Sequence, residues 1–297
     1  MKKIKFLDYK NNFLGIKNPS NKKSKVYIVP YGLEKTTSYG KGTSKGPAEI
    51  LKASHQIELF DDELKLEPCN FFYPLTLDID KIPSSHIKAL KNLENIVNSI
   101  VKLDKLPIIL GGEHSITSFC IKPILDRYKK LTVVQFDAHA DLRNTYQNEK
   151  NSHACAMRRC LDNRNLDIIS IGTRSISKDE FEFFRGNEDR IKIYWARNNE
   201  NWNLKKLQNS IKDKNIYISF DLDAFDSSIM PATGTPEPGG LSWYQALNIL
   251  KIIYKNSNIV GADINELSPI KKIDSYNFTA AKLIYKIISY SILKNYL

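Results

Sequence analysis

Residues 136–143, which read FDAHADLR, carry side chains of the types that bind divalent metal ions. They follow LTVVQ, an apolar and β-branched run that predicts a buried strand. Side chains two apart in an extended chain point to the same side, and Asp137, His139 and Asp141 have that spacing. If the extended geometry persists to the end of this stretch, the three side chains converge on one point. The spacing therefore predicts a metal site at the end of this strand.

Two further predicted strands end in side chains of the same kind. IYISFDLDAFD carries Asp221 and Asp223, and the apolar run LPIIL leads into GGEHS with His114. One His or Asp at a strand end is usually a cap or a surface residue, but three such stretches together favour a shared site. Carboxylates with two imidazoles and no thiolates suit Mn²⁺, and less well Mg²⁺, Fe²⁺ or Ni²⁺. Six ligands suit two ions with bridging carboxylates, an arrangement that activates water for hydrolysis.

The elements that position these residues alternate between strand and helix. Apolar runs predict strands at 25–32, 72–80, 106–117, 131–141, 166–175, 191–196, 214–226 and 258–269. Helical spacing predicts helices at 48–58, 84–103, 118–130, 153–163, 181–190, 279–297 and, after a Pro/Gly loop, within 231–256. This alternation predicts a three-layer α/β/α fold, one domain over residues 1–297 with a mostly parallel central sheet and an irregular N-terminal arm at 1–24. Ligands of such sheets lie beyond the carboxyl ends of the strands, where all the candidate residues fall.

Composition narrows the partners. The net charge is +11, but the lysines are spread along the chain and no aromatic–basic motif accompanies them, so we expect no nucleic-acid partner. No apolar run reaches the roughly 18 residues of a membrane helix, and the N-terminus has no signal-peptide pattern, so we expect no membrane partner. The four cysteines lack CxxC spacing, which predicts free thiols in a cytoplasmic protein. We expect Cys155, near a candidate histidine, to be buried rather than nucleophilic.

Six segments together resemble one family. GGEHS, FDAHADLR, SHACAMRR, SFDLDAFDSS, PATGTPEPGGLSW and GADINELSP are similar, in order and spacing, to the motifs of the arginase–agmatinase (ureohydrolase) family. The similarity extends from about Tyr31 to the C-terminus. It implies an arginase-like fold and a manganese enzyme that hydrolyses a small cationic guanidino substrate to urea and an amine. It also implies a homo-oligomer, a trimer or a hexamer.

The resemblance assigns the metal ligands by motif. It implies that one ion is held by His114, Asp137, Asp141 and Asp221. It implies that the other is held by Asp137, His139, Asp221 and Asp223. Asp137 and Asp221 would be the bridges between two Mn²⁺ ions, with Ni²⁺ or Fe²⁺ as other possible metals.

The resemblance also assigns three catalytic roles. Activated water would attack the guanidinium carbon, and Asp141 would pass a proton to the leaving amine. His153, in SHACAMRR, matches the family's proton-shuttling histidine, a role that its ordinary pKa near 6.5 suits. Glu266, in ADINELSP, matches the carboxylate that pairs with the guanidinium, because a planar cation suits a bidentate acceptor. A helix cap is the structural alternative for His153, and an ion-pair partner is the alternative for Glu266.

The substrate follows from the loop after Asp141. This loop, LRNTYQNEKNSHA, and the earlier TTSYGKGTSKGPAEI resemble bacterial agmatinases, and the NLHG run of arginases is missing. We therefore expect agmatine, hydrolysed to putrescine and urea in polyamine biosynthesis. Arg143 and Lys150 lie in this part of the chain and would suit a substrate with a carboxylate, so guanidinobutyrate and guanidinopropionate remain possible substrates. Arginine and guanidine also remain possible. A catalytically silent scaffold, a nucleic-acid binder and a metal-dependent deacetylase are alternatives from other classes, and Glu266 and His153 favour guanidine over amide chemistry.

Overall fold

A central parallel sheet organises the molecule. The computed structural model describes residues 4–17 and 21–297, and its strands follow the order β2-β1-β3-β8-β7-β4-β5-β6, with every described pair parallel. The strands are β1 (Val26–Tyr31), β2 (Leu75–Thr76), β3 (Leu106–Gly111), β4 (Leu131–Phe136), β5 (Leu166–Thr173), β6 (Ile191–Trp195), β7 (Asn215–Asp221) and β8 (Asn258–Asn265). The predicted parallel sheet is confirmed.

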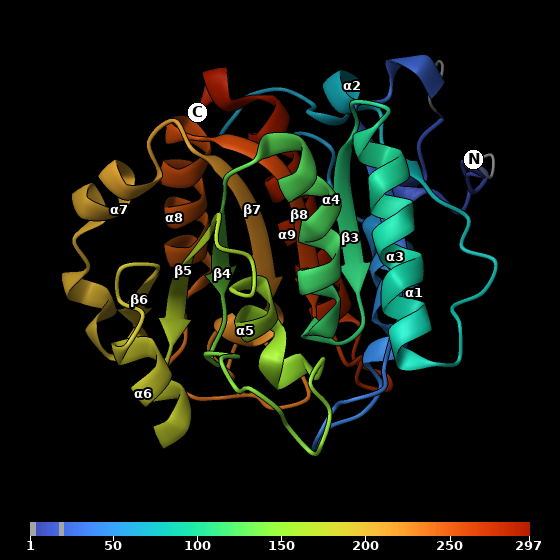
Figure 1. Ribbon diagram of the computed structural model, residues 1–297. Coiled ribbons are helices and arrows are strands. Elements are labelled where there is room, and N and C mark those ends of the chain that lie inside the picture. Colours follow the sequence, from blue (N-terminus) through green and yellow to red (C-terminus); the bar gives the residue numbers. More distant parts are fainter. Residues whose placement is uncertain (1–3, 18–20) are drawn as a thin grey trace.

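Helices cover both faces of this sheet (Figure 1). One hydrophobic core contains side chains of α1 (Gly46–Ser54), α2 (Cys69–Phe72), α7 (Leu204–Ile211), α8 (Trp243–Asn256) and α9 (Ser275–Ile292). The other contains side chains of α3 (His86–Val101), α4 (Thr117–Tyr128) and α5 (Ala156–Cys160), and α6 (Lys178–Arg185) packs against it. The three-layer α/β/α arrangement is therefore confirmed.

The strands alternate between the two cores with a period of two. In β4, Val134 and Phe136 face the first core, whereas Val133 faces the second. Every residue of β4 is buried, because helices cover both faces of the strand. This double burial explains why the sequence shows continuous apolar runs instead of alternation.

Several predicted elements differ from the structure. The strand predicted at 72–80 is confirmed only at Leu75–Thr76, the two residues of β2 that pair with β1, because α2 ends at Phe72 and Tyr73 has a left-handed backbone. The sequence analysis also missed α7, a helix of only eight residues in which only Leu207 and Ile211 are buried. The strands predicted at 106–117, 131–141 and 214–226 end earlier, at Gly111, Phe136 and Asp221.

The predicted N-terminal arm is only partly described, because residues 1–3 and 18–20 lie outside the described residues. Between them, the arm contains a short 3₁₀ turn at Phe13–Gly15, and Phe13 and Leu14 are buried in the first core. The Asn12 side chain donates to the Pro74 carbonyl and accepts from the Thr76 backbone. This part of the arm is therefore packed on the sheet edge. The single-domain organisation stays a prediction.

The strand order brings four carboxyl ends together. β3, β8, β7 and β4 are consecutive neighbours, so the residues that follow them meet at one edge of the sheet. Gly111, the last residue of β3, permits the close approach to β8, because a Cβ on it would lie 2.0 Å from Asn265 Oδ1. Gly112 is equally confined, because its Cβ would lie 2.0 Å from the Leu33 carbonyl oxygen. Among the described residues, no helix is both long and apolar enough to cross a membrane.

Candidate active site

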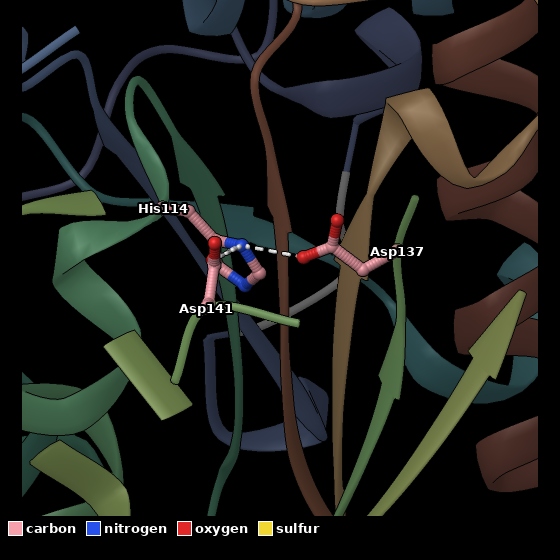
Figure 2. A group of neighbouring side chains, drawn as sticks. All are labelled: His114, Asp137 and Asp141. Carbon is pink, nitrogen blue, oxygen red and sulfur yellow. Dashed lines mark ion pairs between the residues drawn. The ribbon is translucent and has the colours of Figure 1, made fainter. Parts of the chain in front are cut away.

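His114 lies at the centre of a group of carboxylates (Figure 2). It begins the 3₁₀ turn after β3 and is buried. Its Nδ1 atom is 3.1 Å from Asp137 Oδ2, 3.0 Å from Asp141 Oδ2 and 3.4 Å from Asp221 Oδ2. The structure therefore brings together the four residues predicted for the first ion.

The hydrogen bonds of Ser219 determine which nitrogen of His114 carries the proton. Ser219 Oγ donates to Asp263 Oδ1 at 2.7 Å, and His114 Nε2 is 2.8 Å from the same hydroxyl. A serine has one proton to donate, so Nε2 must be the donor to Ser219. The Nδ1 lone pair then faces the carboxylates, and within the described chain this buried atom has no hydrogen-bond partner of good geometry. A lone pair among carboxylate oxygens is a set of ligands for a cation.

The pKa values also indicate that a positive charge belongs here. Burial lowers the pKa of His114, but the three aspartate carboxylates around its Nδ1 atom outweigh this effect and raise the pKa well above its ordinary value. Burial and the charge of Asp137 raise the pKa of Asp141 to about 7. Burial and the charges of Asp223 and Asp137 raise the pKa of Asp221 well above its usual range. Divalent cations would neutralise this repulsion and keep all the carboxylates ionised.

A second group of ligand atoms lies next to the first. His139 Nδ1 is 2.9 Å from Asp223 Oδ2 and 3.7 Å from Asp137 Oδ1. Asp137 thus belongs to both groups, through a different oxygen in each. Asp221 contributes Oδ2 to the first group, while its Oδ1 accepts the backbone N–H of Asp223. Its predicted bridging role stays a prediction.

The ligands of the DxHxD stretch converge for a reason other than strand geometry. β4 ends at Phe136, and Asp141 has a left-handed backbone with φ of +52°. Asp141 therefore turns toward His114, whereas His139 turns toward Asp223. The expectation of an extended stretch was wrong, although its three side chains do meet at the same edge of the sheet.

Arg174 holds the segments around the second group together. Its guanidinium donates to the carbonyl oxygens of Asp223, Phe225, Glu237, Pro238 and Gly172 at 2.8 to 3.2 Å. His139 Nε2 is also 3.8 Å from Glu237 Oε1. Sequence reasoning missed Arg174, and its position directly after β5, at the carboxyl edge of the sheet, was the signal.

Other residues that sequence reasoning missed support the first group from within the strands. Ser219 in β7 and Asp263 in β8 orient His114, and Gln135 in β4 donates to Asp137 Oδ2 at 2.7 Å. Each is a buried polar side chain between buried apolar neighbours of its strand. A buried polar group needs a partner, so these interruptions of the apolar runs were the signal.

Five of the six ligand residues, all except the fully buried Asp137, line a cavity of about 180 Å³, which His153 and Glu266 also line. Glu266 Oε1 accepts the backbone N–H of His114 at 2.7 Å, which leaves Oε2 available on the side of Gly234. Burial and the charge of Glu113 raise the pKa of Glu266 well above its usual range. Burial lowers the pKa of His153 below its ordinary value. All the predicted catalytic residues therefore share one cavity.

The loop after Asp141, residues 142–154, is called the specificity loop here, and its two basic residues differ in position. Arg143 lines the cavity, but its Nε is 3.8 Å from Glu180 Oε2 and its guanidinium lies over the Tyr146 ring at 5.0 Å. Lys150 is exposed and is not among the described residues that line the cavity. Cys155 is fully buried, and burial raises the pKa of its thiol to about 11, which fits the structural role expected for it.

Comparison with known families decides the classification. The model of the arginase family matches residues 24–289, which is most of the chain. This chain belongs to the arginase family. The motifs that indicated this family therefore sit at the carboxyl edge of a sheet with the order described above, and the protein is a hydrolase of the ureohydrolase class.

Curated relatives and solved structures agree with this membership. N(1)-aminopropylagmatine ureohydrolase of Synechocystis sp. is 35% identical over 274 residues, 89% of this chain and 88% of that protein. Agmatinase of Bacillus cereus is 32% identical over 260 residues, covering 85% and 87%. The structure of agmatine ureohydrolase of Thermoplasma volcanium has a TM-score of 0.80 at 29% identity and covers 91% of this chain and 90% of that one.

Proposed function

We propose that this arginase-family hydrolase converts agmatine and water into putrescine and urea. We further propose that it does so with two Mn²⁺ ions. The proposed ligands are His114, Asp137, His139, Asp141, Asp221 and Asp223. The proposed catalytic residues are Asp141, His153 and Glu266.

The charge of the cavity is the observation that carries the choice of substrate. Its lining contains the carboxylates of Asp141, Glu180, Asp221, Asp223 and Glu266. Arg143 is the one lysine or arginine among the described lining residues, and Glu180 pairs with it. An acidic cavity with its single cation already paired suits agmatine, which is positive at both ends, better than a guanidino acid.

The fit of the metal ligands supports the hydrolytic part of the proposal. The set of carboxylate oxygens and imidazole nitrogens suits Mn²⁺, and Asp137 offers one oxygen to each group. When bound, two such ions supply an activated water and polarise the guanidinium. His114 is prepared for this role by Ser219, which fixes the Nδ1 lone pair toward the carboxylates.

The remaining residues then bind the substrate and move protons. The free Oε2 of Glu266 accepts hydrogen bonds from the guanidinium and holds its plane over the ligand groups. Asp141, which is ionised when the metal ions are bound, takes up a proton from the attacking water and passes it to the leaving amine nitrogen. His153 relays a proton between the cavity and solvent, because burial keeps its imidazole neutral near pH 7.

A urea-release assay on a panel of guanidino compounds tests the substrate. The panel contains agmatine, arginine, guanidinobutyrate, guanidinopropionate and guanidine, with Mn²⁺ present. We expect agmatine to have the highest kcat/KM. A guanidino acid with the highest kcat/KM would overturn the choice of substrate. A metal-replete protein that releases no urea from any compound would indicate the silent scaffold instead.

N(1)-aminopropylagmatine is a second candidate substrate. The relative with 35% identity carries this compound in its name, and the exposed ring of Tyr39 lies at the lining of the cavity, where a longer amine would emerge. Adding this compound to the same panel decides between the two. A kcat/KM above that of agmatine would make it the preferred substrate.

The metal and the assembly need separate measurements. We propose Mn²⁺ as the native ion. Elemental analysis of protein purified without added metal tests this, and a predominance of Ni²⁺ or Fe²⁺ would overturn the assignment of Mn²⁺. We also propose a cytoplasmic homo-oligomer of single-domain chains, a trimer or a hexamer. Light scattering coupled to gel filtration gives the mass, and a monomer would exclude this assembly.

A further inference from the structure

Thr36 lies between the buried Glu113 and His153. Thr36 Oγ1 is 2.9 Å from Glu113 Oε1 and 3.2 Å from His153 Nδ1, and it accepts the backbone N–H of His153 at 3.0 Å. Glu113 is fully buried and belongs to the GGEHS motif, yet neither the metal groups nor the proposed catalytic roles use it. Its place next to the proposed shuttle histidine needs an explanation.

The partners of Glu113 indicate how the protons are arranged. Glu113 Oε2 accepts the backbone N–H groups of Lys35 and Thr36, both at 2.6 Å. Glu113 Oε1 accepts the Ser115 hydroxyl at 2.6 Å in addition to Thr36 Oγ1. All these partners are donors, so the Glu113 carboxylate accepts a hydrogen bond from each of them. The Thr36 hydroxyl therefore donates its single proton to Glu113.

The hydroxyl oxygen of Thr36 can then only accept from His153. The backbone N–H of His153 provides one donor, and Nδ1 must provide the other. Ser152 Oγ, 3.3 Å from the same Nδ1, can share this proton. The opposite tautomer would set the Nδ1 lone pair against the Thr36 oxygen and lose the hydrogen bond. Nε2 is therefore the nitrogen that keeps its lone pair.

The surroundings hold the ring in this orientation. The Tyr146 ring packs edge-to-face against the imidazole with 5.8 Å between the ring centroids, and His153 lines the same cavity as Glu266. His86 lies between Glu113 and the specificity loop. Its Nε2 atom is 3.5 Å from Glu113 Oε1, and its Nδ1 atom is 3.5 Å from Glu149 Oε2. The same carboxylate thus connects the metal-ligand turn, the loop at 35–36 and the histidine.

We propose that Thr36, held by Glu113, is a positioning residue that keeps the proton of His153 on Nδ1 and leaves the Nε2 lone pair for proton transfer in the cavity. The proposal rests on the shuttle role of His153 in the proposed function. With Thr36 in place, the imidazole carries its proton on Nδ1 before substrate binds, whereas a histidine free in solution would not be restricted to one tautomer.

Nitrogen-15 NMR of the histidine side chains tests the tautomer without any substrate. The protein is loaded with diamagnetic Zn²⁺, and loss of one signal pair in His153→Ala assigns His153 among the five histidines. We expect the neutral ring to carry its proton on Nδ1 in the wild type and in Thr36→Ser, and a mixture of tautomers in Thr36→Val. A wild-type ring protonated on Nε2 would overturn the proposal, whatever the true substrate is.

Kinetics separate positioning from a merely structural effect. Thr36→Val should lower kcat about tenfold with little change in KM, and Thr36→Ser should restore most of it. In the His153→Ala background, Thr36→Val should cause no further loss of kcat, because the hydroxyl acts through the histidine. An equal loss with and without His153 would overturn the positioning role.

Discussion

Asp141 and Glu266 share an unusual backbone conformation. Their φ angles are +52° and +67°, in the left-handed region that costs a non-glycine residue on the order of 1–3 kcal/mol. Tertiary hydrogen bonds hold both in place: the Glu266 N–H donates to the Gly112 carbonyl, and the Asp141 carbonyl accepts from Arg158. At the scale of single residues, the strain turns each carboxylate toward the cavity, where the proposed reaction needs it.

Asp137→Asn should remove metal from both groups. Asp137 gives one oxygen to each, and an amide replaces one of these oxygens with a donor that repels a cation. Elemental analysis after dialysis should show two ions per wild-type chain and a clear deficit in the variant, together with loss of turnover. Asp126→Asn, the same change on an exposed position of α4, is the control. Full metal content with unchanged turnover would exclude Asp137 as a ligand.

His153→Ala should leave the metal in place but slow turnover by roughly a hundredfold, since positioned acid–base groups contribute on that order. His153 lines the cavity but belongs to neither ligand group. Metal content and kcat, measured on the same preparation, check this outcome. His55→Ala, at the end of α1 and bonded to the Asn12 carbonyl, is the control. Loss of metal in His153→Ala would show that the shuttle assignment is wrong.

At the scale of elements, the carboxyl ends of the strands are joined by side chains that reach several loops at once. Arg174, directly after β5, bonds five carbonyl oxygens from three segments, including that of Asp223. The rigid, branched guanidinium suits this task, because it has five donors in fixed directions. The loops that carry the second ligand group therefore depend on β5, although β5 contributes no ligand itself.

Arg174→Lys should weaken the second ligand group without unfolding the protein. The ammonium has three donors at one atom and cannot reach all of these carbonyls, so we expect a loss of about 1–3 kcal/mol in the free energy of unfolding. Denaturant unfolding and calorimetric titration with Mn²⁺ measure the two effects. Arg185→Lys, on the exposed face of α6, should change neither. If Arg174→Lys bound Mn²⁺ at both sites as tightly as the wild type does, this result would contradict the role given to Arg174.

At the scale of the whole molecule, an ion-pair network far from the cavity joins the loop after α1 to the last helix. Lys286 of α9 is buried, and its Nζ is 2.9 Å from Asp61 Oδ2 and 3.2 Å from Glu63 Oε2. Lys251 of α8 is 2.8 Å from Glu63 Oε1. The network thus connects two helices on one face of the sheet. Removing one carboxylate would leave the buried Lys286 with fewer opposite charges around it, which is destabilising.

Glu63→Gln should reduce stability near neutral pH but not in strong acid. Burial raises the pKa of Glu63, but hydrogen bonds from Lys251 and Tyr290 and the charge of Lys286 lower it to about 2. Because the folded-state pKa lies below the unfolded value near 4.3, this contribution is complete above about pH 4.3 and is lost as the pH falls toward 2.

Urea unfolding at several pH values checks this prediction. The difference in unfolding free energy between the wild type and Glu63→Gln should be largest near neutral pH and should shrink as the solution is acidified. Glu182→Gln, on the exposed face of α6, is the control and should match the wild type throughout. A difference that stays constant down to low pH would show that the ionisation of Glu63 does not stabilise the fold.

The sequence alone determined the class of fold and the identity of most site residues. Strands covered on both faces are mostly apolar, so they can be recognised in the sequence without any tertiary information. Parallel strands present their carboxyl ends at one edge, so Asp137, Asp221 and His114, each just after such a run, could be expected to meet. Short helices, such as α2 with four residues and α7 with eight, could not be recognised in this way.

Tertiary structure decided how these residues are arranged. The order β3-β8-β7-β4 places His114, Glu266, Asp221 and Asp137 on adjacent strands, although they lie far apart in the chain. It also set the left-handed turn at Asp141 and the hydrogen bond from His114 to Ser219. These features depend on contacts between distant segments, and no local pattern of side chains encodes such contacts. Local residue types therefore determined which groups meet at the carboxyl edge, and long-range packing determined their orientation there.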